Sequence, residues 1–210
     1  KAVYFKGPLM SIFIARHGET DHNKNRILQL PNTPLSITGQ QQAKLLALRL
    51  QSQGITRIIS SDYLRAQQTA QALSDISKIG LELNPLLRER NLGDIRGKSY
   101  DELAIDPFAL DYIPVNGESW DEFHQRVANA WEFISQQAKL TEGHLLIVTH
   151  GLVCRALLPH LSQTSNVKSL SQYGNTSLTK VDAYPPWAIE YLNCTAHLDS
   201  NATPDNHTPA

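Results

Sequence analysis

The chain has 210 residues, of which 41% are hydrophobic and 19% are charged, a composition typical of a water-soluble globular protein. Its formal net charge of −1 excludes the strong positive field of most nucleic-acid or membrane-surface proteins, so any affinity for anions must come from a local cluster. No apolar stretch has the length of a membrane-spanning helix. We expect neither nucleic acid nor a membrane as a partner. Cys154 and Cys194 form no metal-ligand pattern and indicate reduced thiols in a cytoplasmic protein.

Residues 10–198 contain no repeat and no low-complexity linker, which predicts a single domain. Residues 1–9 lack the apolar core of a signal peptide, and the only methionine, Met10, directly precedes the first strand-like segment. We therefore interpret residues 1–9 as a cloning or upstream remnant. The polar, proline-containing residues 199–210 are typical of a disordered tail.

The first half of the chain alternates strand and helix patterns. Residues 11–15 ("SIFIA") are a short apolar run typical of a buried strand. Residues 33–54 place apolar side chains at helical spacing, with Thr38 as the predicted N-cap and Gly54 as a stop signal. The next predicted elements are a strand at 55–60 and a helix at 62–77.

The second half continues the alternation and ends in a hairpin. Its predicted elements are a short strand at 81–87, a loop at 88–97, a helix at 119–140, a strand at 144–150, a helix at 151–161 and paired strands at 177–184 and 188–193. Strands that alternate with helices favour the α/β class. We predict a three-layer sandwich in which helices flank a largely parallel central sheet.

Three of the predicted strands end in polar residues of related character. The first ends in "RHG" at 16–18, the second in "SS" at 60–61 with Arg65 one turn into the next helix, and the third in "HG" at 150–151. Since the carboxyl ends of parallel strands meet at one edge of the sheet, two arginines and two histidines gather there. Guanidinium groups and helix N-termini bind dianions, so phosphate is the predicted ligand.

An imidazole beside a bound phosphoryl group indicates nucleophilic catalysis by His17, because histidine can be phosphorylated on a ring nitrogen. Neighbouring cations are expected to lower the pKa of His17 and keep its ring neutral. Glu89, a carboxyl group in a glycine-containing loop with apolar neighbours, is the candidate acid for the leaving oxygen. The alternative for Glu89 is a surface salt bridge with Arg88 or Arg90.

Five motifs then identify a family. They are "ARHGET", "SSDYLRAQQTA", "LLRERNLGD", "NGES" and "IVTHG". With these motifs in the family's order, the sequence resembles the histidine phosphatase (phosphoglycerate mutase-like) superfamily, and its phosphatase branch in particular. The resemblance covers roughly residues 11–182. It implies the α/β fold of that family and a reaction that needs no metal and no organic cofactor.

The resemblance also assigns roles to residues. His17 matches the phosphorylated nucleophile of the family, and Glu89 matches its proton donor. The residues matched to phosphate or substrate binding are Arg16, Asn23, Arg65, Glu118, His150 and Gly151.

The loop after Asn23 departs from the family pattern. His22 stands where many members have tryptophan, Gln29 where glycine is usual and Asn32 where aspartate is usual, and the loop is one residue short. Because this loop faces the substrate in the family, we expect His22 and Gln29 to contact the substrate. The departures affect substrate identity and not the reaction.

Other basic residues remain open in their interpretation. Arg88, Arg90 and Arg96 either carry solvated charges or hold a second anionic group of the substrate, and Arg90 is the best candidate for the latter. Arg155 is interpreted as a packing residue. A metal site built on His17 and His150 is a weak alternative, because no carboxylate or cysteine ligand accompanies them.

The sequence therefore predicts a metal-independent phosphatase that hydrolyses a small phosphorylated metabolite through a covalent phosphohistidine. The closest alternative is a cofactor-dependent phosphoglycerate mutase, which the short segment between Glu89 and His150, and Leu152 after "HG", disfavour. A non-catalytic phosphate-binding regulator is a third alternative. The sequence leaves the oligomeric state open, and a homodimer is compatible with it.

Overall fold

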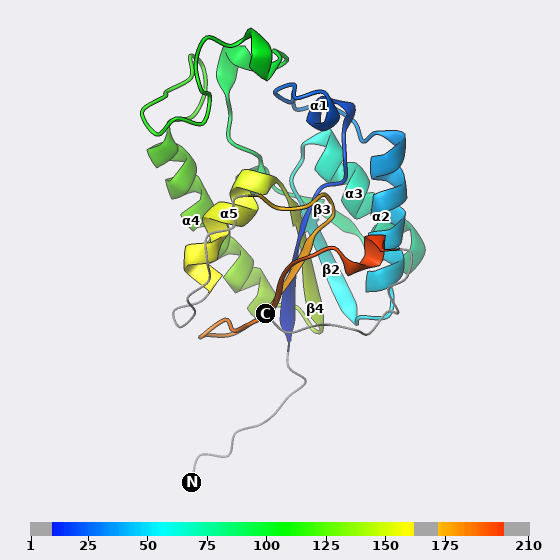
Figure 1. Cartoon of the computed structure of the whole chain (residues 1–210). Coiled ribbons are helices and arrows are strands. Elements are labelled where there is room, and N and C mark those ends of the chain that lie inside the picture. Colours follow the sequence, from blue (N-terminus) through cyan, green and yellow to red (C-terminus); the bar gives the residue numbers. More distant parts are fainter. Residues whose placement is uncertain (1–9, 162–171, 200–210) are drawn as a thin grey trace.

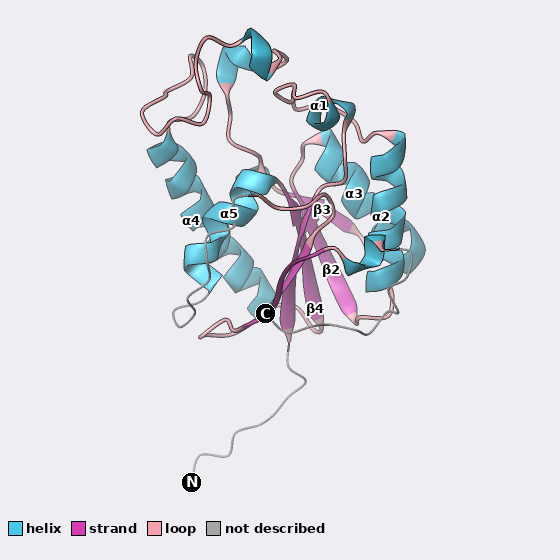
Figure 2. Cartoon of the chain, in the orientation of Figure 1, coloured by secondary structure: helices cyan, strands magenta, loops and turns pink. Residues whose placement is uncertain are grey.

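A computed structural model describes residues 10–161 and 172–199. Within these residues one six-stranded sheet forms the centre of the molecule, in the order β3-β2-β4-β1-β5-β6 (Figure 2). The pairs β3-β2, β2-β4 and β4-β1 are parallel, whereas β5 and β6 add an antiparallel edge. The strands are β1 (Ser11–Arg16), β2 (Ile55–Ser60), β3 (Leu81–Leu83), β4 (His144–Thr149), β5 (Leu178–Asp182) and β6 (Ile189–Cys194).

Helices cover both faces of the sheet, which confirms the predicted three-layer α/β architecture. Figure 1 shows α4 and α5 on one side of the sheet and α2 and α3 on the other. Four short 3-10 helices lie in the connections: η1 (Pro85–Leu87), η2 (Gly93–Ile95), η3 (Tyr100–Glu102) and η4 (Ala196–Leu198). The α-helices are α1 (Asp21–Lys24), α2 (Ile37–Leu50), α3 (Leu64–Ser77), α4 (Trp120–Lys139) and α5 (Gly151–Leu161).

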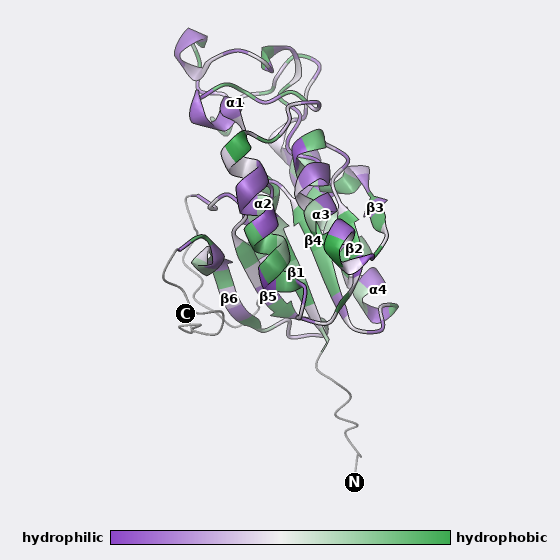
Figure 3. Ribbon diagram, turned by 90° about the vertical axis from the view of Figure 1, so that its right-hand side faces the viewer, coloured by the Kyte–Doolittle hydropathy of each residue, from purple (hydrophilic) through white to green (hydrophobic). Residues whose placement is uncertain are grey.

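The alternation of side chains along β1 explains why this strand is buried on both faces. Ile12 and Ile14 belong to the apolar cluster under α4 and α5. Phe13 and Ala15 belong to the cluster under α2 and α3. Successive side chains of a strand point to opposite faces, so a continuous apolar run supplies both cores. In Figure 3 the central strands are mostly hydrophobic, whereas helices α2 and α3 in front of them carry both hydrophilic and hydrophobic residues.

Helix α2 begins at a different residue from the one predicted. Its N-cap is Ser36, whose side chain accepts a hydrogen bond from the backbone N–H of Gly39 at 3.0 Å. Thr38 lies inside the first turn, so the prediction of Thr38 as the N-cap is wrong. Both residues carry a hydroxyl group, and the structure selects Ser36 because its backbone is extended, as an N-cap requires.

Other element boundaries also differ. Helix α3 starts at Leu64 and not at residue 62, and the strand predicted at 81–87 ends at Leu83, since Pro85 starts a 3-10 turn. The short helix α1, which Thr20 caps, was not predicted. The hairpin of β5 and β6 is confirmed.

The predicted remnant at residues 1–9 and residues 200–210 of the predicted tail lie outside the described residues. The division of the chain into these parts and one domain stays a prediction. No helix in the described part of the chain is long and apolar enough to cross a membrane.

The register of the sheet positions the candidate site. Arg16, the last residue of β1, pairs with Thr149 at the end of β4, and Ser60 of β2 pairs with Val148. Three parallel strands therefore end side by side, and the residues that follow them meet at one edge. The loops that carry residues 17–36 and 84–119 rise above this edge (Figure 1).

Candidate active site

His17 and His150 directly follow the neighbouring strands β1 and β4, and their rings meet at the carboxyl edge of the sheet. The ring centroids are 5.2 Å apart, and the ring planes meet at 59°. Both side chains are buried, with 1% and 0% of their surfaces exposed. The structure therefore brings together the two histidines that the sequence placed at one edge.

The two ring nitrogens of His17 have different partners. Nδ1 lies 2.7 Å from the carbonyl oxygen of Gly18, which can only accept, so Nδ1 carries the proton. Nε2 then has a free lone pair, and Arg65 Nε donates to it at 3.3 Å. Burial, together with the charges of Arg65 and Arg16, holds the pKa of His17 well below its usual range. The ring is thus a neutral base with Nε2 available as a nucleophile.

Arg16 and Arg65 place guanidinium groups around this nitrogen. Arg65 is almost fully buried, donates from Nη1 to the carbonyl oxygen of Leu30 at 3.0 Å, and has its pKa lowered to about 10, mainly by burial. Arg16 donates from Nη1 to the carbonyl oxygen of Tyr173. Its buried Nε has no hydrogen-bond partner among the described residues. An unpaired buried donor is costly, so a ligand that accepts a hydrogen bond there would be stabilised.

His150 has the same pattern of one satisfied and one free nitrogen. Its Nε2 lies 2.8 Å from Ser61 Oγ, which also accepts a hydrogen bond from the backbone N–H of Tyr63 at 3.2 Å. Ser61 can therefore turn its own proton toward Nε2, which leaves the ring proton on Nδ1. Within the described structure, this buried Nδ1 has no partner. Burial and the charge of Arg65 hold the pKa of His150 well below its usual range, so the ring is neutral.

Glu89 lies in the loop that follows β3, and backbone N–H groups bind both its carboxylate oxygens. Oε1 accepts from Arg90 and Oε2 from Leu152, each at 3.1 Å. The residue as a whole is partly exposed, but its carboxyl group is enclosed, and this burial raises the pKa above that of an ordinary glutamate. The two N–H groups, Arg65 and Arg16 oppose the rise. Glu89 can hold a proton more readily than a surface carboxyl group.

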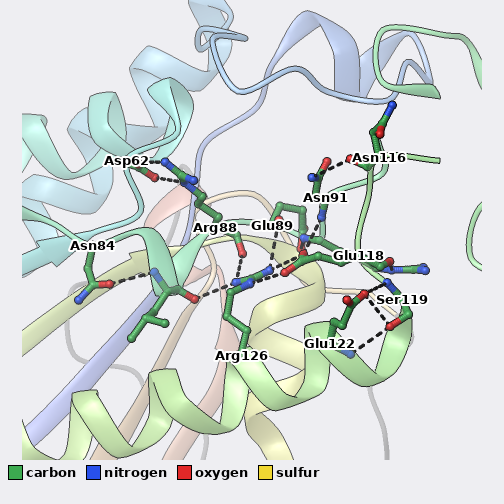
Figure 4. Close-up of polar contacts among 12 residues, drawn as sticks. Asp62, Asn84, Arg88, Glu89, Asn91, Asn116, Glu118, Ser119, Glu122 and Arg126 are labelled. Carbon is green, nitrogen blue, oxygen red and sulfur yellow. Dashed lines mark hydrogen bonds and ion pairs between the residues drawn. The ribbon is translucent and has the colours of Figure 1, made fainter. Parts of the chain in front are cut away.

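The predicted alternative for Glu89 is not found. Arg88 pairs with Asp62, with an Nη2–Oδ2 distance of 2.5 Å, and not with Glu89 (Figure 4). The guanidinium of Arg90 donates to the carbonyl oxygens of Glu118 and Tyr112, at 3.1 and 2.9 Å, and of Pro107, and it lies 3.9 Å from the Trp120 ring centroid. Neither arginine forms an ion pair with Glu89 in the described structure.

Asn23 and Gln29 share one hydroxyl group as a partner. Thr20 Oγ1 lies 3.2 Å from Asn23 Oδ1 and 2.9 Å from Gln29 Oε1, and it accepts the backbone N–H of Asn23 at 3.0 Å. The amide NH2 groups of both residues make no hydrogen bond to other described residues. They remain available as donors to a ligand in front of His17.

A cavity of about 750 Å³ opens in front of these residues. Its size suits a small organic molecule and exceeds that of a phosphate ion alone. The predicted residues that line it are Arg16, His17, His22, Asn23, Gln29, Arg65, Glu89, Arg90 and Gly151. Within residues 10–161 and 172–199, no group of three or more His, Cys, Asp or Glu side chains is arranged to hold a metal ion.

Two predicted site residues do not line this cavity. His150 lies behind it, against His17. Glu118 forms a salt bridge with Arg126, with an Nε–Oε1 distance of 2.6 Å, and Oε2 accepts the backbone N–H of Asn91 (Figure 4). In contrast to the prediction, Glu118 holds the loop that carries Glu89 and does not line the cavity.

Several lining residues were missed by the sequence interpretation. Arg155, interpreted as a packing residue, is exposed on the first turns of α5 and lines the cavity. Arg26 and Tyr100 lie in loops whose pairing no local pattern indicates. The other residues that were not predicted include Lys24, Tyr63, Asp106, Phe108, Gln172, Tyr173 and Asn175.

Comparison with known proteins agrees with this geometry. The family profile described as the histidine phosphatase superfamily (branch 1) matches residues 12–195. A protein of Yersinia enterocolitica named "Probable phosphoglycerate mutase GpmB" is 32% identical over 218 residues, which cover 92% of this chain and 97% of the relative.

Solved structures of similar fold support the same family. Bacillus stearothermophilus YhfR superposes with a TM-score of 0.78 at 29% identity, over 90% of this chain and 100% of that chain. A mycobacterial glucosyl-3-phosphoglycerate phosphatase superposes with a TM-score of 0.75 at 26% identity, over 88% of this chain and 99% of that chain. The profile, the relative and the shared fold together show that this chain belongs to the histidine phosphatase superfamily.

Proposed function

We propose that this protein is a phosphatase that hydrolyses a small phosphomonoester through a covalent phosphohistidine at His17. The observation that carries the proposal is the pair of unpaired donors beside His17. Four buried side-chain N or O atoms lack a hydrogen-bond partner among the described residues, and two of them are Arg16 Nε and His150 Nδ1. Donors left unpaired beside a neutral imidazole are expected where an anion binds.

In the first step, Nε2 of His17 attacks phosphorus and forms the P–N bond while the P–O bond to the leaving alcohol breaks. Arg65 Nε, which donates to Nε2 in the absence of ligand, turns its hydrogen bond to a phosphoryl oxygen. Glu89 donates its proton to the departing oxygen, so that an alcohol and not an alkoxide leaves. The raised pKa of Glu89 fits this role, because the group must be protonated when the substrate binds.

In the second step, water attacks the phosphohistidine. Glu89, now a carboxylate, takes a proton from this water as the new P–O bond forms and the P–N bond breaks. His17 returns to its neutral form, with the proton still on Nδ1 and held by Gly18. Inorganic phosphate leaves, and Glu89 is protonated for the next cycle.

Two arginines and two neutral donors supply the electrostatic stabilisation in both steps. Charge spreads over the phosphoryl oxygens in the transition state, where Arg16, Arg65 and Asn23 offer donors from the cavity wall and the unpaired Nδ1–H of His150 offers one from behind His17. All of these groups belong to the chain itself, and we propose that the reaction needs no metal.

The mutase alternative keeps support from the names of relatives, since the Yersinia enterocolitica protein is named a probable phosphoglycerate mutase. A mutase must keep water from the phosphohistidine and return the phosphoryl group to a bound intermediate. Incubation with 3-phosphoglycerate and a bisphosphoglycerate primer separates the two reactions. Interconversion of phosphoglycerates without phosphate release would support a mutase, and steady release of phosphate would support the phosphatase.

The proposal is tested by inorganic phosphate release across a panel of phosphomonoesters, with a His17→Asn variant beside the wild type. We expect turnover by the wild type and loss of about 10⁴-fold or more in the variant. His124→Asn is the matched control, because His124 is exposed on α4 and lies outside the catalytic cavity. Absence of turnover by the wild type on every substrate would favour the non-catalytic regulator.

A further inference from the structure

The mouth of the cavity is built from two loops that pair with each other. Residues 26–28 lie antiparallel to residues 97–100 through an isolated bridge between Ile27 and Ser99. Three backbone hydrogen bonds extend this pairing. They run from Leu28 N to Lys98 O at 2.9 Å, from Gly97 N to Leu28 O at 2.7 Å and from Tyr100 N to Arg26 O at 2.9 Å. We call these two segments the mouth ribbon. Backbone hydrogen bonds between the two segments therefore fix the positions from which the side chains of the mouth ribbon project.

The ribbon places Arg26 directly beside Tyr100. The guanidinium carbon of Arg26 lies 5.2 Å from the centroid of the Tyr100 ring, a cation–π contact, and the ring also packs against Phe108 at 5.8 Å. Both Arg26 and Tyr100 line the cavity. Arg26 is exposed and makes no side-chain hydrogen bond within the described residues. The tyrosine ring therefore holds a cation whose donors have no acceptor among the described residues.

The charges that line the cavity do not balance. Seven cationic side chains lie beside two carboxylates, Glu19 and Asp106, and the carboxyl group of Glu89. The four ion pairs among the described residues all lie elsewhere, so none involves a cation of the cavity. The seven cations are Arg16, Lys24, Arg26, Arg65, Arg90, Arg96 and Arg155.

The fold and the proposed reaction account for three of these cations. Arg16 and Arg65 surround His17, and Arg90 donates to three backbone carbonyl groups. The carboxylates of the mouth already have donors: Glu19 accepts from Ser36 Oγ at 2.8 Å, and Asp106 accepts from the backbone N–H of Phe108. Positive charge at the mouth is therefore left without a counter-ion among the described residues. Arg96 donates from Nε to the carbonyl oxygen of Gly93 at 3.1 Å, whereas Arg26 is held on the Tyr100 ring and keeps its donors free for a ligand.

Tyr100 connects this cation to the catalytic carboxyl group. Burial raises the pKa of Tyr100, Glu89 raises it further, and Arg26 and Arg16 oppose the rise. Arg26, Tyr100 and Glu89 also line the same cavity. Because the phosphoryl group binds at His17 and Glu89 is the proposed donor to the departing oxygen, the leaving group extends from Glu89 toward the mouth, where Arg26 lies.

We propose that Arg26, held on Tyr100, binds a second anionic group on the leaving group of the substrate. The substrate class is then a phosphomonoester that carries a carboxylate or a second phosphate. This inference rests on the proposed function for the direction of the leaving group. A charge-assisted hydrogen bond at an exposed site discriminates a charged group from a neutral hydroxyl group by about tenfold.

Matched substrate pairs test the proposal. In the first pair, 3-phosphoglycerate differs from glycerol 3-phosphate by a carboxylate in place of a hydroxymethyl group. In the second pair, fructose 1,6-bisphosphate differs from fructose 6-phosphate by a second phosphate. We expect the wild type to favour the member with the second anion by about tenfold in kcat/KM, and Arg26→Gln to reduce that ratio to near one. The pair with the larger ratio identifies the second anion as carboxylate or phosphate.

Two further variants separate charge recognition from loop structure. Tyr100→Phe keeps the ring under Arg26 and is expected to keep the ratio, whereas Tyr100→Leu removes the ring and is expected to lower it. Lys98→Gln is the control, because Lys98 is exposed on the same ribbon and does not line the cavity. An Arg26→Gln ratio equal to that of the wild type, or no preference in the wild type, would overturn the inference.

Failure of the inference and failure of the proposed function are distinguishable. Turnover of p-nitrophenyl phosphate, whose leaving group has no second anion, tests the phosphatase reaction alone. If the wild type turns over no substrate, thermal protection by each member of the two pairs reports binding without catalysis. Greater protection by the bis-anionic members that is lost in Arg26→Gln would support the second-anion site in a protein that is not a phosphatase. Equal protection would overturn it.

Discussion

The edge of the sheet and the mouth of the cavity are built in different ways. At the edge, His17, Arg65 and His150 are buried, and strands paired in fixed register position the residues around them. At the mouth, Arg26 and Arg155 are exposed and lie on a paired loop and on the outer side of a helix. At the edge, a few hydrogen-bond donors are held in fixed positions around Nε2 of His17. At the mouth, the cationic side chains have no counter-ions among the described residues.

We therefore expect the edge to carry out the chemical step and the mouth to select among substrates. A change at the edge is expected to affect the chemical step for every substrate, because the phosphoryl group is common to all of them. A change at the mouth is expected to affect only the discrimination between leaving groups. Substitutions in each region test whether the two are as independent as their construction implies.

Glu89→Gln should give the largest effect and should depend on the leaving group. An amide cannot donate the proton that an alcohol leaving group needs, so kcat/KM for alkyl phosphates should fall by about 10²–10⁴-fold. The loss should be much smaller for p-nitrophenyl phosphate, whose acidic leaving group departs without a proton. Steady-state kinetics on both substrates checks this, and equal losses on both would contradict the role of Glu89 as an acid.

Thermal unfolding provides the control for Glu89→Gln. The folded protein holds the Glu89 proton more tightly than the unfolded chain, so this group makes folding less favourable as pH rises from the ordinary glutamate pKa through its raised value. At neutral pH the variant should therefore unfold at the same temperature as the wild type or higher. A lower temperature would indicate loss of structure and not of an acid.

The pH profile of kcat/KM on alkyl phosphates should reflect the protonation states of both His17 and Glu89. His17 must be neutral, and its lowered pKa keeps it so down to pH values below the usual range of histidine. Glu89 must be protonated, so activity should fall as pH rises through its raised pKa. In Glu89→Gln the fall at higher pH should disappear. A profile unchanged by this substitution would assign the acid to another group.

Arg65→Lys should lower kcat/KM by about 10²-fold on every phosphomonoester, because lysine keeps the charge but loses the planar pair of donors. Arg88→Lys is the matched control, since Arg88 is exposed and pairs with Asp62 outside the cavity. A loss that differs between substrates with and without a second anion would show that the edge also selects the leaving group.

Ser61→Ala should have a moderate effect, of about tenfold, through His150. Without the hydroxyl group, Nε2 of His150 loses its partner and the ring proton is no longer held on Nδ1. We expect kcat to fall more than KM rises, and Ser61→Thr to restore activity. If Ser61→Ala lowers the unfolding temperature and leaves kcat unchanged, Ser61 supports only the structure.

Arg90→Lys should have the smallest effect on catalysis and a clear effect on stability. Lysine cannot reach the carbonyl groups of Pro107, Tyr112 and Glu118 together, so the free energy of unfolding should decrease by about 1–3 kcal/mol. The substrate ratio that tests Arg26 should stay unchanged. A change in that ratio would restore the prediction that Arg90 holds a second anionic group.

The site residues at the carboxyl edge of the sheet could be predicted well from the sequence because they directly follow strands. Arg16, His17 and His150 could be placed together from the expectation of parallel strands alone. Glu89 was a candidate acid from its apolar neighbours, and the family motifs strengthened that prediction. The position of Arg65 followed from a helix that starts beside this edge. These inferences required no knowledge of how loops fold.

The mouth could not be predicted in the same way. The contact of Arg26 with Tyr100 depends on a backbone pairing between segments that are far apart in the sequence, and no local pattern announces it. Glu118 was expected in the pocket, yet Arg126 on the next helix provides a closer ionic partner. Thr38 was predicted as the cap of α2, whereas Ser36 has the extended backbone and the side-chain hydrogen bond of the N-cap.

The most direct measurement is the identification of the phosphorylated residue. The enzyme is mixed with a labelled phosphomonoester, denatured within one turnover at alkaline pH to preserve phosphohistidine, and digested for peptide mapping by mass spectrometry. The account predicts that the phosphoryl group is on Nε2 of His17 and that the label decays as inorganic phosphate appears. A label on another residue, or phosphate release with no phosphoenzyme in single-turnover mixing, would contradict it.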